Sequence, residues 1–293
     1  MKIIRASDLG FCMGVRRAVE LAVAAAPSRP GERVYTLGAL IHNPKVLAQL
    51  EGLGVKTLDF AQNAPPLENA VVIIRAHGIS PLLEKELRES CYRVVDATCP
   101  KVKKNQLAAA RLVKEGFRLF IAGEGKHAEI EGILGYANSE GAEGKALVVE
   151  NAEGARQSAA ELYEKDRSAK TAIIAQTTIS EAEYSAIALA IKQYFPKLKI
   201  AKSICGATKA RQQSLKKLLP QVDAVVVAGG KGSANTRRLL AIAEAGGKPA
   251  IIAEDALDLP AHFSAFETVG LCAGASTPDC VIGEIELSLK GRG

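Results

Sequence analysis

The chain has 293 residues, 48% hydrophobic and 24% charged, so it is long enough for two ordinary domains or three small ones with buried cores. Its net charge of +6 is spread along the chain in short pairs, and only 4% of its residues are aromatic. Nucleic-acid-binding proteins usually gather basic and aromatic side chains on one surface. This pattern therefore argues against nucleic acid and favours an acidic small molecule or an acidic protein as the partner.

The N-terminus and the cysteines bear on the cellular compartment. The first eight residues include Lys2, Arg5 and Asp8 and lack the uninterrupted apolar stretch of a signal peptide. No apolar run is long enough to cross a bilayer. We therefore expect a cytoplasmic protein without a membrane segment, whose six cysteines act as ligands, catalysts or buried side chains rather than as disulfides.

Short β-branched runs alternate with longer stretches of helical period along the whole chain. Such an alternation predicts an α/β protein with largely parallel sheets. In chain order, the clearest elements are a helix over 15–26, a strand over 71–74, a helix over 102–114, two strands over 119–122 and 172–175, a helix over 209–219 and a strand over 224–227.

A threefold repeat underlies this alternation. Cys12, Cys99 and Cys205 each stand just ahead of a predicted helix, and the fourth residue after each cysteine is basic. Polar loops then follow at matching distances. The residues of these loops, His42, His127 and Ser233, lie 30, 28 and 28 residues after the respective cysteine.

We interpret the repeat as three related α/β units, over residues 13–97, 98–196 and 197–283, with residues 1–12 adding a strand to the third. Each unit offers one thiol and two polar loops at the carboxyl ends of its strands, where open α/β sheets bind their ligands. Packing around a common axis would bring the three thiols together. Chance is the alternative explanation of these spacings, because residue identity between the units is low.

Three separated thiols have three possible uses: buried side chains, a zinc site completed by a histidine, or ligands of an iron–sulfur cluster. Spacing does not decide between them, since the sequence has no Cys-x-x-Cys pair. A helix N-terminus and a basic residue one turn later both stabilise a thiolate. Three thiolates would leave one iron of a [4Fe–4S] cluster open as a Lewis acid. The remaining cysteines, expected to be buried structural thiols, are Cys91, Cys272 and Cys280.

The strand-end loops carry histidines, hydroxyls and an amide, which suit the acceptor oxygens of a diphosphate. Alone, each such residue is more often a helix cap or a surface side chain. Glu129 stands beside a histidine in these loops and is the natural proton donor. The candidate binding residues are His42, His77, His127, Thr177, Ser233, Asn235 and Ser276.

Several sequence motifs of the chain together resemble those of one enzyme family, the 4-hydroxy-3-methylbut-2-enyl diphosphate reductases. The similarity runs from the first residues to about Pro278. The motifs are Gly10-Phe-Cys12-Met-Gly-Val15, Ile41-His-Asn-Pro44, Arg75-Ala-His-Gly-Ile-Ser-Pro81, Asp96-Ala-Thr-Cys-Pro100, Gln176-Thr-Thr178 and Ala273-Gly-Ala-Ser-Thr-Pro278.

The resemblance implies a trefoil-like arrangement of three small α/β domains around a central, oxygen-sensitive [4Fe–4S] cluster. It implies the last step of the non-mevalonate isoprenoid pathway, a reductive dehydroxylation that gives isopentenyl and dimethylallyl diphosphates. The electron donor would be ferredoxin or flavodoxin, acidic carriers that suit the positive charge of this chain. We expect a monomer.

The resemblance also assigns roles by position. Cys12, Cys99 and Cys205 match the three cluster ligands of the family, which leave one iron open. Glu129 matches the acid that delivers protons, and Thr177 the threonine near the substrate hydroxyl. The residues that match diphosphate and substrate contacts are His42, His77, His127, Ser233, Asn235 and Ser276, with His127 also counted as catalytic beside Glu129.

Four residues depart from the family pattern. Ala128 stands where a proline usually separates histidine and acid, and Ala234 replaces a common second serine. Gly206 and Lys209 stand where larger or neutral residues are usual. These departures bear on substrate affinity and on the product ratio.

Two other functions compete with this interpretation. One is a non-catalytic iron–sulfur or zinc redox sensor on the same scaffold, against which the retention of Glu129 beside His127 argues. The other is a reductase of a different phosphorylated allylic alcohol, which would suit the altered loops.

Overall fold

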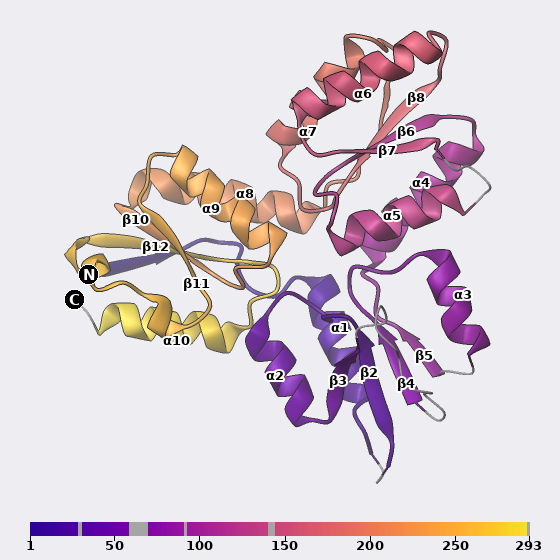
Figure 1. Ribbon diagram of the computed structural model, residues 1–293. Helices are drawn as coiled ribbons and strands as arrows, with labels where there is room; N and C mark the ends of the chain where they lie inside the picture. The colour runs from indigo at the N-terminus through magenta and orange to yellow at the C-terminus, as the bar shows by residue number, and fades with distance from the viewer. Residues whose placement is uncertain (29–30, 59–69, 91–92, 140–143, 292–293) are drawn as a thin grey trace. The chain divides into compact units, whose positions relative to one another are not determined.

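The computed structural model describes residues 1–28, 31–58, 70–90, 93–139 and 144–291 (Figure 1). These residues form three four-stranded sheets, and every strand pair among them is parallel, so the predicted α/β class is confirmed. The chain divides into two compact units. The first comprises Met1–Val19, Ile41–Leu53 and Gly206–Gly293, and the second Glu20–Leu40 and Gly54–Cys205.

The first unit is built on sheet A, with the strand order β1-β12-β10-β11. The N-terminal strand β1 pairs in parallel with β12, close to the C-terminus of the chain. The elements of this unit are β1 (Lys2–Arg5), α2 (Pro44–Gly52), α8 (Gly206–Leu218), β10 (Ala224–Ala228), α9 (Ala234–Ala245), β11 (Ala250–Ala253), β12 (Thr268–Ala273), α10 (Asp279–Lys290), the start of α1 (Met13–Ala24) and the short helices η1 (Leu219–Gln221), η2 (Ala256–Asp258) and η3 (Ala261–Ala265).

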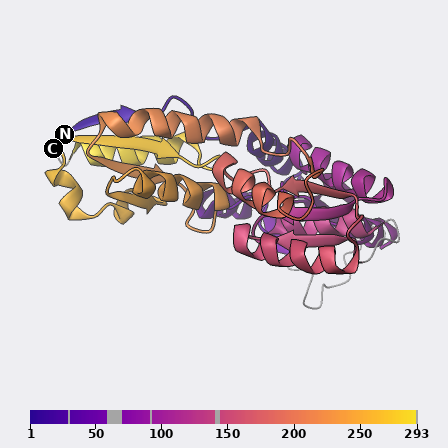
Figure 2. The same ribbon diagram turned by 90° about the horizontal axis from the view of Figure 1, so that it is seen from above.

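Alternation along β10 divides the core of this unit into two layers. Val226 faces the side that packs on α10, whereas Val225 and Val227 face the side that packs on α8 and α9. Successive side chains of a strand point to opposite faces, so a strand buried on both faces is apolar throughout. Figures 1 and 2 show the helices on the two faces of the sheet.

The second unit contains sheets B and C, with the orders β3-β2-β4-β5 and β7-β6-β8-β9. One face of sheet B packs on α3 through Leu87, and the two faces of sheet C pack on α4 with α5 and on α6 with α7. The elements are β2 (Arg33–Leu37), β3 (Val55–Leu58), β4 (Ala70–Ile74), α3 (Pro81–Glu89), β5 (Arg93–Asp96), α4 (Pro100–Lys114), β6 (Arg118–Ala122), α5 (Ala128–Asn138), β7 (Ala146–Val149), α6 (Ala152–Lys165), β8 (Thr171–Ala175), α7 (Glu181–Lys192) and β9 (Lys199–Ile200).

The elements predicted from the sequence are present. The expected strands coincide with β4, β6, β8 and β10, and the expected helices with α1, α4 and α8, each of which begins two or three residues earlier than predicted. The boundaries proposed for three domains stay a prediction. Among the described residues, no helix combines the length and the apolar character needed to cross a membrane.

Candidate active site

The predicted polar residues lie where strands end. In the second unit, His77 follows β4, His127 follows β6 and Thr177 follows β8. In the first unit, Ser233 follows β10 and Ser276 follows β12. Because the strands of each sheet are parallel, their carboxyl ends share one edge, which is the edge where such sheets bind ligands.

Glu129 and Thr177 form a closely connected pair in the second unit. The carboxylate oxygen Oε1 accepts a hydrogen bond from the backbone N–H of Thr177 at 2.7 Å, and Oε2 accepts one from the Thr177 hydroxyl at 2.8 Å. Glu129 is 1% exposed. The carboxyl group is therefore joined directly to a hydroxyl that could pass on its proton, in an environment that strengthens both hydrogen bonds.

His127 lies beside this pair and begins helix α5. Its Nδ1 accepts a hydrogen bond from the N–H of Glu129 at 3.1 Å, so the histidine is the N-cap residue of α5. The ring of His77 meets that of His127 edge to face, with 5.2 Å between centroids. Ala128 is the first helical residue, a position that also favours proline, so the departure from the family pattern keeps the helix start.

The first unit holds the other polar candidates. The Ser276 hydroxyl donates to the carbonyl of His42 at 3.2 Å. Ser233 is the N-cap residue of α9, and neither amide atom of Asn235 has a hydrogen-bond partner among the described residues, although Asn235 is only 4% exposed. A buried amide without partners costs free energy unless a ligand or water satisfies it, which suits a binding role.

The three predicted cluster cysteines share one backbone setting. Cys12, Cys99 and Cys205 each directly precede a helix, α1, α4 and α8 respectively. Their backbone N–H groups donate to carbonyls of strand-end loops, which belong to Ala275, Ala76 and Thr177 at 3.1, 3.0 and 3.0 Å. All three side chains are partly exposed. Each of these thiols therefore lies at the positive end of a helix dipole.

The other cysteines differ from these three. Cys272 is buried in β12, and burial raises the pKa of its thiol to about 12, so it stays protonated, as expected of a structural thiol. The prediction for Cys280 was wrong, because this side chain is exposed. It lies on α10, whose buried residues are Val281, Ile282, Ile285 and Leu289. Cys91 lies outside the described residues.

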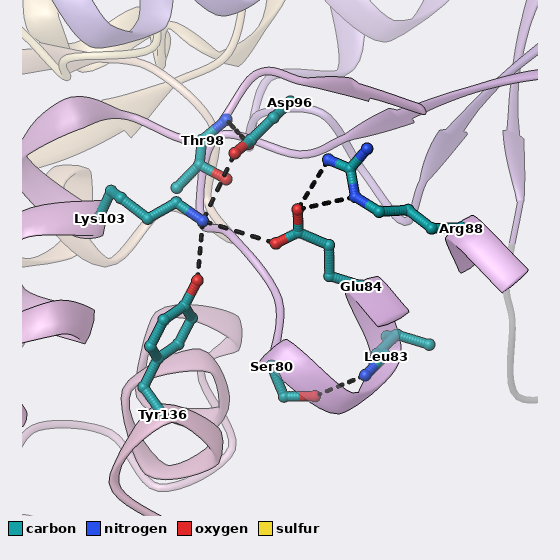
Figure 3. A network of polar contacts seen from close by, with 8 residues as sticks. All are labelled: Ser80, Leu83, Glu84, Arg88, Asp96, Thr98, Lys103 and Tyr136. Atoms are coloured by element: carbon teal, nitrogen blue, oxygen red, sulfur yellow. Dashed lines mark hydrogen bonds and ion pairs between the residues drawn. The ribbon is translucent and has the colours of Figure 1, made fainter. Parts of the chain in front are cut away.

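A polar network surrounds Lys103, four residues after Cys99 (Figure 3). Its Nζ donates to the Tyr136 hydroxyl at 2.9 Å and lies 3.4 Å from Asp96 Oδ2 and 3.8 Å from Glu84 Oε2. The other carboxylate oxygen of Asp96 accepts from the N–H of Thr98 at 2.9 Å. The charge of Lys103 is thus balanced by two carboxylates, and the start of α4 is tied to β5, α3 and α5.

This network makes stability depend on pH. Burial disfavours the charged forms of Asp96 and Lys103, but hydrogen bonds and their mutual attraction outweigh it: the pKa of Asp96 is lowered, and the pKa of Lys103 is raised. The contribution of Asp96 is present above its unfolded pKa of about 4 and is lost as the pH falls through the lower folded value. That of Lys103 is lost only at strongly alkaline pH.

Replacing Lys103 by methionine should lower the free energy of unfolding of the apoprotein by about 1 kcal/mol at pH 7, since the ion pairs are partly exposed to solvent. The difference from the unmodified chain should shrink as the pH falls from about 4 through the lowered folded pKa of Asp96, because protonation of Asp96 removes its attraction to Lys103. Urea unfolding at pH 7 and pH 3 measures it. Lys85→Met is the control, because Lys85 pairs with Glu89 on an exposed face of α3. Equal losses in both variants would contradict the prediction.

Gln176 connects two of the candidate loops, and the sequence argument did not single it out. It is fully buried, and its Oε1 accepts a hydrogen bond from the N–H of Glu124 at 3.1 Å, in the loop that leads to His127. It also precedes Thr177 directly. The sequence motif Gln176-Thr-Thr178 could have indicated this residue, because there a polar side chain directly follows an apolar strand.

Comparison with known proteins decides the family. A family model described as "LytB protein" matches residues 3–290. The chain belongs to the LytB family. Members with similar sequences include the 4-hydroxy-3-methylbut-2-enyl diphosphate reductases of Treponema denticola, 43% identical over 99% of both chains, and of Aquifex aeolicus, 40% identical over 98% of this chain and 96% of that one.

Solved structures of the family have the same fold. A structure described as (E)-4-hydroxy-3-methyl-but-2-enyl diphosphate reductase, the terminal enzyme of the non-mevalonate pathway, is 37% identical, covers 99% of both chains and has a TM-score of 0.69. A structure described as the E-1-hydroxy-2-methyl-but-2-enyl-4-diphosphate reductase from Plasmodium falciparum is 25% identical, with a TM-score of 0.87 over 98% of this chain and 87% of that one.

Proposed function

We infer that this chain catalyses the reductive dehydroxylation of 4-hydroxy-3-methylbut-2-enyl diphosphate, the terminal step of the non-mevalonate isoprenoid pathway, to isopentenyl and dimethylallyl diphosphates. The similarity to the Treponema denticola reductase, 43% identity over 99% of both chains, carries this conclusion. The reaction consumes two electrons and two protons. The C–O bond breaks, the oxygen leaves as water with one added proton, and the other proton ends on carbon.

We propose that Cys12, Cys99 and Cys205 hold the [4Fe–4S] cluster that the family uses. The donor set supports this proposal, since each of these thiols lies at a helix N-terminus and is partly exposed, unlike the buried thiol of Cys272. When bound, the cluster would supply the two electrons and a Lewis-acidic iron without a protein ligand. The trefoil-like arrangement of the domains around it stays a prediction.

We propose that Glu129 donates the proton that the leaving oxygen needs. Its Oε2 accepts from the Thr177 hydroxyl at 2.8 Å, and once Oε2 is protonated this bond reverses, so that the carboxyl proton can move to the hydroxyl while the hydroxyl proton moves on. His127 supports this arrangement, because its ring accepts from the N–H of Glu129 and fixes the first turn of α5. Burial of Glu129 also excludes water that would compete for the same proton.

We further propose donors for the diphosphate. Imidazole, hydroxyl and amide groups can each donate to phosphate oxygens, and such bonds to a charged acceptor are stronger than neutral ones. The residues proposed for this role are His42, His77, His127, Ser233, Asn235 and Ser276.

The electron donor we propose is a ferredoxin or a flavodoxin. Both are acidic carriers, and the net charge of +6 would speed their association with this chain at low ionic strength. We further propose that the protein acts as a monomer in the cytoplasm.

One experiment tests the function. The protein is purified without oxygen, its iron, sulfide and zinc are determined, and turnover of 4-hydroxy-3-methylbut-2-enyl diphosphate is measured with a reduced dye. We expect one cluster per chain and formation of both products. Stoichiometric zinc without sulfide would contradict the cluster. A loaded cluster without turnover would favour the redox sensor, and faster turnover of another phosphorylated allylic alcohol would favour the alternative reductase.

Ala234→Ser should tighten diphosphate binding. Ala234 is the first residue of α9 and is 3% exposed, so the added hydroxyl lies beside Ser233 and Asn235. One hydrogen bond to a charged acceptor is worth about 1.5 kcal/mol, or roughly tenfold in affinity. The KM for substrate and the inhibition constant of inorganic diphosphate should both fall. Ala152→Ser, at the first position of α6, is the control; unchanged constants in Ala234→Ser would contradict the assignment of this loop.

A further inference from the structure

Two buried polar side chains occupy equivalent places after two of the proposed cluster ligands. Asn105 on α4 lies six residues after Cys99, and Arg211 on α8 lies six residues after Cys205. They are 4% and 6% exposed. Because polar groups are costly to bury without hydrogen bonds, the partners of these two side chains indicate what they do.

Asn105 connects the end of β8 with the loop that leads to Cys205. Its Nδ2 donates to the carbonyl of Ala175 at 3.2 Å and to that of Ser203 at 3.0 Å. The hydroxyl of Ser203 accepts in turn from the N–H of Ala175 at 2.8 Å. Ser203 stands two residues before Cys205. One N–H of this buried amide therefore holds the backbone two residues ahead of the Cys205 thiol, and the other holds the end of β8 to which that backbone is joined.

Arg211 does the same for the loop that leads to Cys12. Its Nη2 donates to the carbonyl of Gly10 at 2.6 Å, and its Nη1 donates to that of Ala207 at 2.9 Å. Gly10 stands two residues before Cys12. This loop is closely packed, because Gly10 has a φ of +78° and a Cβ there would lie 2.9 Å from Asp279 Oδ1.

These two sets of hydrogen bonds, which we call the Asn105 clamp and the Arg211 clamp, follow one rule. A donor six residues after one cysteine binds the carbonyl two residues before the next cysteine of the repeat: Asn105 acts on Ser203, and Arg211 on Gly10. The third place in the rule, six residues after Cys12, is Ala18, which has no side-chain donor.

The loop ahead of Cys99 is fixed differently. There Asp96 accepts from the N–H of Thr98 at 2.9 Å, and Lys103 holds Asp96 from the first turns of α4 (Figure 3). Neither Asn105 nor Arg211 takes part in this network.

We propose that Asn105 and Arg211 are positioning residues that set the thiols of Cys205 and Cys12, respectively, for binding the iron–sulfur cluster. The proposal rests on the proposed function, since it takes these cysteines to be the ligands. Each clamp joins the loop before a thiol to the helix that follows another thiol. Groups behind the ligands that orient them commonly change metal affinity about 10- to 100-fold when they are removed.

The test uses pairs of variants. Asn105→Leu and Arg211→Met remove the donors at nearly constant size, while Asn105→Gln and Arg211→Lys keep donors with altered reach. Asn151→Leu and Arg156→Met are matched controls, since Asn151 caps α6 and Arg156 pairs with Glu153 on an exposed surface. If a leucine or methionine variant does not fold, the measurements are made on the conservative variants Asn105→Gln and Arg211→Lys.

The first measurement is the rate of alkylation of each cysteine in the folded apoprotein, resolved by peptide mass spectrometry. Asn105→Leu should change the rate at Cys205 about tenfold, and Arg211→Met that at Cys12, because a lost buried hydrogen bond frees the loop. Cys99 should keep its rate in both, and the conservative variants should show smaller changes. Equal changes at all three cysteines, or none, would overturn the proposal.

The second measurement concerns the loaded protein. Both variants should release iron to a chelator about tenfold faster than the unmodified chain, with an altered electron paramagnetic resonance spectrum of the reduced cluster. A lower melting temperature with unchanged release and spectrum would reduce both residues to a structural role and overturn the proposal. If the unmodified chain binds no cluster, the proposed function fails, whereas the alkylation pattern still decides the clamps.

Discussion

Replacing Glu129 by glutamine should reduce turnover about a hundredfold or more while the cluster stays in place. Hydroxide is a poor leaving group, so breaking the C–O bond requires an acid in contact with the leaving oxygen or with a relay to it. Glutamine keeps the size of the side chain and can still accept from the N–H of Thr177, the bond made by Oε1 at 2.7 Å. Its amide N–H would donate to the Thr177 hydroxyl, reversing the present bond, and it has no proton to supply.

The measurement is steady-state turnover together with iron and sulfide content and melting temperature. Glu131→Gln is the matched control, because Glu131 lies in the same first turn of α5 and carries the same charge, but its side chain is 60% exposed and pairs with Arg75. We expect nearly unchanged turnover there. Full activity of cluster-replete Glu129→Gln would refute the proton-donor role.

A purely structural role for Glu129 makes a different prediction. If the carboxylate only stabilised the start of α5, glutamine would cost a little stability and leave turnover near normal. The structure places His127 at the cap of this helix, and the carboxylate of Glu129 bonds to Thr177, 48 residues away in sequence. Turnover and melting temperature, measured on the same preparation, separate the two roles.

Replacing Cys12, Cys99 or Cys205 by serine should abolish the brown colour and the turnover, because a serine hydroxyl is not ionised near neutral pH and is a poor ligand for iron. Each of these residues directly precedes a helix and its backbone is hydrogen-bonded, so serine should leave the protein folded. Iron and sulfide analysis after anaerobic reconstitution measures the effect.

Cys272→Ser is the control for these variants. The pKa of the Cys272 thiol is raised to about 12 by burial, and the residue lies inside β12, so it should not bind iron. A buried hydroxyl in place of the thiol should cost about 1–3 kcal/mol of stability with full cluster content. Equal loss of the cluster in all four variants would contradict the assignment of the ligands.

Local patterns determined much of the fold in advance. The apolar runs at β4, β6, β8 and β10 could be read as strands because they are buried on both faces, which requires continuous apolar residues. The polar residues that end these runs then had to lie at strand ends. The threefold spacing of the cysteines likewise follows from the order of elements in the chain, and all three precede helices as expected.

Contacts between distant segments could not be read in this way. The exposure of Cys280 depends on which face of α10 packs on sheet A, and the partners of Lys103 depend on how α3, β5 and α5 meet. A helical position fixes the direction of a side chain relative to its own helix, but not the neighbour that it reaches.

The sequence by itself therefore determined the class of fold, the thiols ahead of the helices and the acid beside His127, because these depend on residue type and on periods of two and 3.6 residues. Only the tertiary structure decided that Glu129 bonds to Thr177 and that Asn105 and Arg211 hold the loops ahead of Cys205 and Cys12. Such bonds join residues that are 48 to 201 positions apart. They form only where the packing of whole helices on sheets brings a donor within about 3 Å of an acceptor.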